Sequence, residues 1–401
     1  MVSMPDRSSH KEWSLRRLVD FAEIVTGTTP PTRDRSNYGD EYLFVGPGDL
    51  GQGKWVTNTQ KKLSKKGFLV SRRFPKDTIL FTCIGSTIGK SGIASTELTA
   101  NQQINAILPN ESYCPEYLYY ALSQMANKIS ALAGHQAVPI INKTEFGQFL
   151  IPFPPTKSEQ EAIVAVLSDA DALIATLGKL IDKKRNIKRA FMQELLRPMS
   201  HWKTVMLGAL GKTYGGLSGK SKDDFTNGKY PYIPFMNVVN NAIIDPNYVD
   251  YVSIKPGEIQ NMVQTGDLLF NGSSETPEEV GMCSVLLDAA SNLYLNSFCF
   301  GYRLSDTDKV DGLYLAYFFR SGYGRALLYA LAQGATRYNL SKSALMKVSI
   351  PIPPKQEQVK IATILYDIDL EISAINDKVS KYEAIKIGIM QQLLTGRIRL
   401  I

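Results

Sequence analysis

The chain has 401 residues, of which 44% are hydrophobic and 21% charged, and this composition excludes a mainly disordered or collagen-like protein. Its 45 Lys and Arg residues against 38 Asp and Glu give a net charge of +7, which favours a polyanionic partner. The length predicts two or three domains, and no apolar run suits a membrane span or a secretory signal, so we expect a cytoplasmic protein that contacts no membrane.

The first block of the chain, residues 1–150, mixes short β-type runs with a helical pattern. Apolar runs at 79–81 and 104–108 predict strands. Pro115–Leu132 has the periodicity of a helix. This mixture predicts a domain of the α/β (α+β) class.

A basic stretch lies in this block between residues 54 and 76, with eight Lys or Arg residues, no Asp or Glu, and three interleaved aromatic residues. Such a stretch suits the phosphates of a nucleic acid, bound without regard to base sequence. A solvated surface loop is the alternative. We predict DNA phosphate contacts at six of these residues: Lys61, Lys62, Lys65, Lys66, Arg72 and Arg73.

The residues that carry catalysis elsewhere give no recognisable site here. Gly85–Ser91 resembles a phosphate-binding loop but has too few residues between its glycines, so we predict a tight turn between strands. Asp245–Tyr248 resembles an amino-methyltransferase motif but lacks its second proline, and we predict a turn there too. The histidines and cysteines are too scattered for a metal site, a catalytic triad or a disulfide framework, and the cysteines are expected to be buried. We expect no catalytic residue, no metal and no cofactor.

A proline-rich hinge at residues 151–155 precedes a long helical pattern that ends before Pro198. The seam positions alternate in steps of four and three residues from Ile163 to Leu195, as in a coiled coil. Thr156 and Glu159 are spaced to form a capping box at the start of the helix. At the usual rise per residue such a helix would be about 55–60 Å long.

The second half of the chain repeats this organisation. Ile-Pro-Phe-Pro-Pro at 151–155 recurs as Ile-Pro-Ile-Pro-Pro at 350–354, and from the next Glu-Gln pair onward the two helical segments match at a constant offset of 198 residues. The blocks begin near Trp13 and Trp202. The second block has strand-like runs at residues 268–270 and 298–303 and a helical pattern at residues 312–331. We infer an internal duplication.

Each long helix has an apolar stripe that needs a partner, and the helix of equal length in this chain is its own repeat. We therefore predict that the two helices pair as an antiparallel coiled coil, which gives the chain a pseudo-two-fold repeat. The alternative is that each helix packs on its own block alone.

Glycine-containing loops just before the two hinges carry polar side chains that could recognise DNA bases. Gln136 is the candidate in the first loop and Arg337 in the second, because Gln forms paired hydrogen bonds with adenine and Arg with guanine. Both could equally be turn residues.

This organisation resembles the specificity subunit of Type I restriction-modification systems. The resemblance covers nearly the whole chain and rests on the doubled Pro-Pro and Glu-Gln motif, with helices that end in MQELL (192–196) and MQQLL (390–394). GSTIGKSGI (85–93) and NQQINAI (101–107) are smaller family-like segments. The second block departs from the pattern, since its 13 basic and 13 acidic residues balance and Asn296 only loosely matches the first asparagine of NQQ.

The resemblance implies target-recognition domains at residues 1–150 and 198–349, each followed by a hinge and a conserved spacer helix, at 151–197 and 350–401. It also implies a non-catalytic subunit that recognises a bipartite, asymmetric sequence in double-stranded DNA. The partners would be two DNA methyltransferase subunits and, through them, restriction (motor-nuclease) subunits; S-adenosylmethionine and ATP would belong to those partners. Two alternatives stay open: a self-contained DNA methyltransferase or nuclease, and a coiled-coil scaffold that does not bind DNA.

Overall fold

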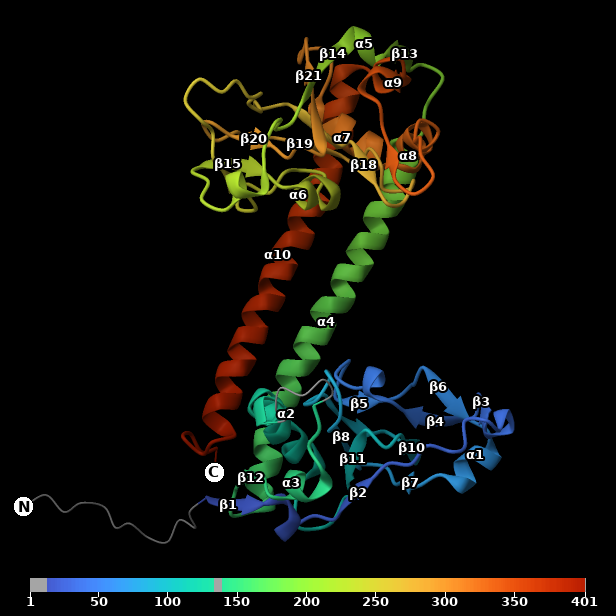
Figure 1. Ribbon diagram of the computed structural model, residues 1–401, viewed down its shortest axis with the longest axis vertical. Helices are drawn as coiled ribbons and strands as arrows, with labels where there is room; N and C mark the ends of the chain where they lie inside the picture. Colours follow the sequence, from blue (N-terminus) through green and yellow to red (C-terminus); the bar gives the residue numbers. More distant parts are fainter. Residues whose placement is uncertain (1–12, 133–138, 401) are drawn as a thin grey trace, which may run out of the picture. The chain divides into compact units, whose positions relative to one another are not determined.

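The computed structural model describes residues 13–132 and 139–400 and divides into two compact units (Figure 1). Unit 1 comprises the residues up to Leu177 together with those from Lys378 onward, and unit 2 comprises Gly178–Asp377. Each unit therefore contains one globular block, the first half of the long helix that follows this block, and the second half of the other long helix.

The globular block of unit 1 contains two layers of strands and several short helices. Its strands are β1 Ser14–Arg17, β2 Ile24–Thr26, β3 Tyr38–Gly39, β4 Tyr42–Val45, β5 Trp55–Val56, β6 Lys61–Leu63, β7 Arg73–Phe74, β8 Ile79–Thr82, β9 Ser91–Ala94, β10 Leu98–Ala100, β11 Ile104–Ile107 and β12 Leu150–Phe153. Its helices are α1 Lys65–Val70, α2 Pro115–Leu132 and α3 Lys143–Gly147, with 3-10 turns at Leu18–Asp20, Arg35–Asn37 and Pro47–Asp49.

One sheet of unit 1 has the strand order β2-β11-β8-β9-β5 and the other the order β3-β6-β4-β10-β7. Side chains alternate between the two faces along each strand, and every residue of β11, β8 and β9 is buried, so these inner strands of the first sheet are covered on both faces. Ile79 and Phe81 of β8 pack on α2, whereas Leu80 packs with the strands of the second sheet. The predicted strands at 79–81 and 104–108 and the predicted helix at 115–132 are confirmed.

The globular block of unit 2 has a similar composition of elements. Its strands are β13 Lys203–Met206, β14 Gly211–Gly215, β15 Tyr230–Ile233, β16 Asp250–Val252, β17 Leu268–Asn271, β18 Ser273–Ser274, β19 Cys283–Val285, β20 Tyr294–Leu295, β21 Cys299–Leu304, β22 Tyr338–Asn339 and β23 Ser349–Ile352. Its helices are α5 Leu207–Leu210, α6 Phe235–Asn240, α7 Gly312–Arg320, α8 Gly322–Tyr329 and α9 Lys342–Met346, with a 3-10 turn at Lys222–Phe225.

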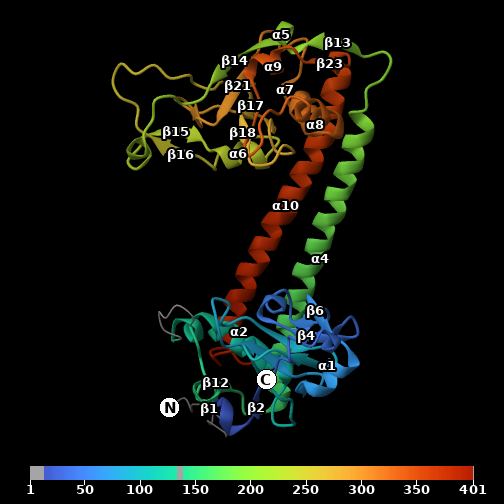
Figure 2. The same ribbon diagram turned by 45° about the vertical axis from the view of Figure 1, so that its right-hand side comes forward.

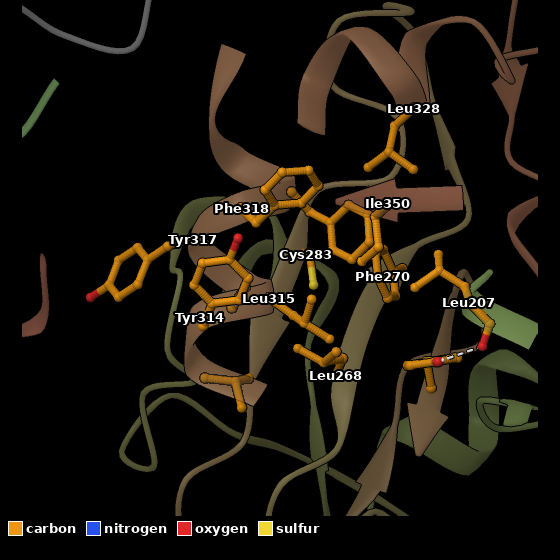
Figure 3. Close-up of a cluster of buried hydrophobic side chains, with 14 of the residues drawn as sticks. Leu207, Leu268, Phe270, Cys283, Tyr314, Leu315, Tyr317, Phe318, Leu328 and Ile350 are labelled. Atoms are coloured by element: carbon orange, nitrogen blue, oxygen red, sulfur yellow. Dashed lines mark hydrogen bonds between the residues drawn. The ribbon is translucent and has the colours of Figure 1, made fainter. Parts of the chain in front are cut away.

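The core of unit 2 lies between α7 and the sheet β14-β21-β17-β19. Figure 3 shows Leu315 and Phe318 of α7 beside Leu268 and Phe270 of β17, all fully buried. The other face of this sheet packs through Leu269 on the smaller sheet β16-β15-β20. Figure 2 shows β15 and β16 of the smaller sheet and β14, β17 and β21 of the larger one.

The helix predicted over residues 312–331 is wrong in one respect, because it is broken at Ser321 into α7 and α8. The Ser321 backbone is extended, and its hydroxyl accepts a hydrogen bond from the Gly324 N–H, which makes Ser321 the N-cap of α8. A Cβ at Gly324 would lie 2.1 Å from the Phe318 carbonyl oxygen, so glycine permits the tight turn between the two helices.

The long helices are α4 Lys157–Leu195 and α10 Lys355–Leu393, each of 39 residues. Every predicted seam position of α10 from Ile361 to Leu393 is buried or half-buried, and the same holds for α4 except at Phe191, which is 41% exposed. The proline-rich segments before the helices form β12 and β23, which pair with β1 and β13. None of the helices in the described part of the chain combines the length and the apolarity that a bilayer crossing requires.

Candidate nucleic-acid interface

The two long helices run antiparallel in unit 2. Lys184 of α4 pairs with Glu371 of α10 (Nζ–Oε2 2.5 Å), and Lys188 pairs with Asp369 (Nζ–Oδ1 2.5 Å), so the partner's number falls as the α4 number rises. The Tyr317 hydroxyl of α7 donates to the same Asp369 carboxylate (2.7 Å). Burial and the nearby carboxylate raise the pKa of Tyr317, which keeps its hydroxyl protonated as a donor.

Unit 1 contains the equivalent arrangement with the helices exchanged. Lys386 of α10, the repeat of Lys188, pairs with Asp171 of α4 (Nζ–Oδ1 2.5 Å), and the Tyr120 hydroxyl of α2 donates to the same carboxylate (2.5 Å). In each unit a tyrosine of the globular block thus contacts an aspartate of its own helix, which pairs with a lysine of the other helix. The antiparallel pairing is confirmed within both units.

The alternative that each helix packs only on its own block is wrong. Leu393 and Leu394 at the end of α10 lie in the core of unit 1, together with Ile163 and Leu167 at the start of α4. Leu196, just after α4, is buried in the core of unit 2. Each core therefore contains side chains from both long helices.

The repeated Glu-Gln pairs attach each block to its helix. Glu159 is fully buried; its carboxylate accepts hydrogen bonds from the Trp13 indole (3.1 Å) and from Arg399 (Nη2–Oε2 2.8 Å). In unit 2 the Glu357 carboxylate contacts the Trp202 indole (3.0 Å) and His201 (3.0 Å) in the same way. The glutamates therefore join the start of a block to the start of its helix.

The glutamines of these pairs and the predicted capping box complete this junction. Gln160 Oε1 accepts the Cys114 N–H (2.7 Å), and Gln358 Oε1 accepts the Asp311 N–H (2.8 Å). The capping box is only half formed: Thr156 accepts the Glu159 N–H (3.2 Å), but the Glu159 carboxylate is used by Trp13 and Arg399.

The six predicted phosphate-binding residues lie on or beside the sheet β3-β6-β4-β10-β7. Lys61 and Lys62 lie on β6, and Lys65 and Lys66 on α1. Arg72 and Arg73 lie at β7. All six residues thus belong to this sheet, to its flanks or to α1, with Lys61 and Lys62 on opposite faces of β6.

Three of these six residues already have partners. Lys66 pairs with Asp34 (2.7 Å), and this hydrogen bond lowers the pKa of Asp34 to about 2, so the Asp34 carboxylate stays charged at neutral pH. Arg73 lies 4.0 Å from Glu97, and the Arg72 guanidinium donates to a backbone carbonyl. Within the part of the chain that the structure describes, Lys61, Lys62 and Lys65 have no acidic side chain within 4 Å.

Lys54, which opens the basic stretch, is not available to a ligand. Its side chain is 13% exposed, and its ammonium group contacts Glu116, Ser168 and Tyr120. It joins α2 to α4 instead.

Of the two predicted base-reading residues, Gln136 and Arg337, the structure describes only Arg337. Gln136 lies outside the described residues. Arg337 is exposed on the loop before β22, with its guanidinium carbon 5.2 Å from the centroid of the Phe298 ring.

Both units share a tight turn formed around an asparagine side chain. Asn101 Oδ1 accepts the Gln103 N–H (3.0 Å), and Asn296 Oδ1 accepts the Phe298 N–H (2.9 Å). A Cβ at Gly27 would lie 2.1 Å from the Asn101 carbonyl oxygen, and a Cβ at Gly216 equally 2.1 Å from that of Asn296. Asn296 is thus the structural counterpart of the first asparagine in NQQ, a match that the sequence showed only loosely.

The segments that resembled enzyme motifs form turns, as predicted. Gly85 and Gly89 have φ angles of 94° and 99° and lie between β8 and β9, and Tyr248 N–H donates to Asp245 O (3.2 Å). The cysteines are free thiols, buried except for the half-buried Cys114. Among residues 13–132 and 139–400, no group of His, Cys, Asp and Glu is arranged to hold a metal ion.

The family model and two known proteins that match this chain are all described as Type I restriction specificity proteins. A family model described as the Type I restriction modification DNA specificity domain matches residues 10–183 and 199–382. The chain is 25% identical to the Type I restriction enzyme MjaVIII specificity subunit of Methanocaldococcus jannaschii, over 97% of this chain and 93% of that protein. It is 23% identical to the EcoKI specificity subunit of Escherichia coli K12, over 87% of this chain and 80% of that protein.

Solved structures have the same fold. The S subunit of a Type I restriction-modification system from M. genitalium matches 98% of this chain and 98% of its own, at 17% identity and a TM-score of 0.58. A chain from a structure on complex assembly and conformational transition of the Type I R-M system matches 97% of this chain and 99% of its own, at 16% identity and a TM-score of 0.61.

Proposed function

Since the chain belongs to the family of Type I restriction-modification DNA specificity proteins, we propose that it is the DNA-recognition subunit of such a complex and recognises a bipartite, asymmetric target in double-stranded DNA. The observation that carries this proposal is the duplication: two family domains in one chain, each joined to both long helices by equivalent contacts. The two units present different side chains on the equivalent turn, Gln103 and Phe298, so the two half-sites should differ.

We propose the domain limits 1–150 and 198–349 for the recognition domains, with hinges and spacer helices at 151–197 and 350–401. The chain itself would be non-catalytic and would hold no cofactor.

The proposed protein partners are two methyltransferase subunits, which would in turn hold restriction subunits. Exposed apolar side chains of the long helices support docking of the methyltransferase. They are Leu173, Ile385 and Ile387 in unit 1 and Leu180, Phe191, Ile364 and Leu370 in unit 2, each 39–57% exposed. Burying such side chains in an interface is favourable, whereas leaving several exposed on one helix pair is unusual for a protein without a partner there.

The test is reconstitution of the full chain with the methyltransferase subunits of its own complex. We expect methyl transfer from S-adenosylmethionine to DNA containing the target, and none by the chain alone. Methyl transfer or cleavage by the chain alone would support an enzyme, and a complex that binds no DNA would support a scaffold.

Charge reversal at the three unpaired lysines gives a test of the phosphate contacts. In the reconstituted complex, Lys61→Glu, Lys62→Glu and Lys65→Glu together should weaken binding to target and non-target DNA alike, by about tenfold or more. The slope of log affinity against log salt should fall by about one for each of these lysines that contacts a phosphate. The control is reversal of three exposed lysines outside the long helices and the basic stretch: Lys128, Lys203 and Lys347. A loss confined to one target sequence would contradict phosphate contact.

A further inference from the structure

A hollow in unit 2 gathers polar side chains from separate loops. Its volume is about 500 Å³, and its polar lining residues are Ser218, Ser273, Ser297, Asn339, Ser341 and Lys342. No Asp or Glu is among its described lining residues. Lys342 is the charged residue in this lining, so the hollow suits an anionic or hydrogen-bonding ligand.

Glycines allow the backbone to form the walls of this hollow. Gly216 approaches the Asn296 carbonyl oxygen too closely for any side chain, and the Asn296 amide fixes the turn that carries Phe298. The Phe298 ring, 54% exposed, lines the hollow.

Arg337 is held above this ring by the neighbouring loop. Gln333 and Asn339 exchange two backbone hydrogen bonds (2.8 and 3.1 Å) that close the loop, and Gly334 takes a φ of 138° that other residues rarely adopt. In the described residues no carboxylate lies within 4 Å of Arg337, so its donors are not used by an acidic side chain.

We infer that Phe298 and Arg337 together form the base-contacting element of the second recognition domain, an inference that rests on the proposed function. A guanidinium group over an aromatic ring is restrained in orientation and keeps its N–H donors for a ligand. Guanine presents two acceptors in the major groove that match such a pair of donors. Lys342 and the serine hydroxyls of the hollow would contact the adjacent sugar and phosphate.

The first recognition domain would use different chemistry at the equivalent turn. Gln103 occupies the place of Phe298, and its side-chain oxygen accepts from the Asn101 amide (3.1 Å). An amide and a stacked guanidinium prefer different bases, which gives the asymmetry between the half-sites a physical cause.

The test measures base preference in the reconstituted complex with the methyltransferase. Methylation rates are compared on a target and on variants with each base pair of the second half-site changed. Arg337→Ala should relax the preference at one G·C pair by about tenfold to a hundredfold. Phe298→Ala should relax the preference at the same pair, and the double variant should be no worse than Arg337→Ala alone.

Two further variants separate this role from a structural one. Arg337→Lys keeps the charge but loses the paired donors, so it should retain overall affinity and lose the preference. Tyr329→Ala, at 52% exposure in the same unit, is the matched aromatic control and should leave the preference unchanged. Each preference is a ratio of rates from one preparation, so a loss of folded protein cancels.

The outcomes are distinct. The inference is overturned if Phe298→Ala leaves the base preference unchanged or changes it at a different base pair. It is also overturned if Arg337→Ala lowers the methylation rate of all DNA sequences by the same factor. A wild-type complex without any sequence preference would overturn the proposed function and this inference with it.

Discussion

Leu394→Ala should destabilise unit 1 by about 2–5 kcal/mol and leave unit 2 unchanged, and Leu196→Ala should do the reverse. Both side chains are fully buried. Leu394 follows the second block in the chain but lies in the core of unit 1, and Leu196 follows the first block but lies in the core of unit 2. Truncating a buried leucine costs its transfer free energy and leaves a cavity, so each loss should appear in the core that contains the leucine.

Hydrogen exchange measured peptide by peptide in the full chain distinguishes the two units. Protection in β8 and β11 should fall about 30-fold or more in Leu394→Ala, and protection in β17 and β21 by a similar factor in Leu196→Ala. Leu173→Ala, at an exposed position of α4, is the control and should change little. If each variant instead lowered the protection of the block that precedes the substituted residue in the chain, the packing of each helix end in the core of the other block would be wrong.

Arg320→Met should lower the free energy of unfolding of unit 2 by about 3–4 kcal/mol, because buried carbonyls would lose their donor. Arg320 at the end of α7 is half-buried, and desolvation of its guanidinium lowers its pKa to about 10, so it remains charged at neutral pH. Its guanidinium donates to the carbonyls of Cys283, Val238 and Asn241 at 2.5–2.7 Å, and thereby ties α6 to the central sheet.

Urea unfolding of the full chain, with hydrogen exchange in β17 and β19 as the local probe, measures this effect. Arg320→Lys should be intermediate, since a lysine keeps the charge but offers fewer, less fixed donors. Arg185→Met removes an exposed arginine of α4 in the same unit and should cost less than about 0.5 kcal/mol. A loss below about 1 kcal/mol for Arg320→Met would show that water replaces the guanidinium.

The sequence predicted those features that repeat at short range. Strand and helix periodicity predicted β8, β11 and α2. The repeated heptad seam predicted α4 and α10, and nearly all of its positions are buried or half-buried. Lys188 and Lys386 occupy positions of the otherwise mostly apolar seam, and this repeated charge could have indicated a partner on the other helix, although none was predicted. The partners, Asp369 and Asp171, were visible only as repeated residues.

Contacts between distant segments outside the paired long helices were not predictable. Lys54 is buried against Glu116 and Ser168, which are 62 and 114 residues away, so the sequence could not separate it from the surface lysines near it. The break at Ser321 depends on one hydroxyl that competes with the helix backbone. Phe298 carried no signal of its own, because its exposure depends on the turn that Asn296 forms.

Two different recognition domains held by paired helices are tested most directly by a map of methylated positions in DNA. The DNA comes from cells that contain this chain and its methyltransferase, and the map has single-base resolution. We expect two unlike short sequences separated by a constant number of unspecified base pairs, with one methylated base in each. A continuous target, two identical half-sites, or half-sites at variable separation would contradict a chain in which paired helices hold two different recognition domains on one DNA duplex.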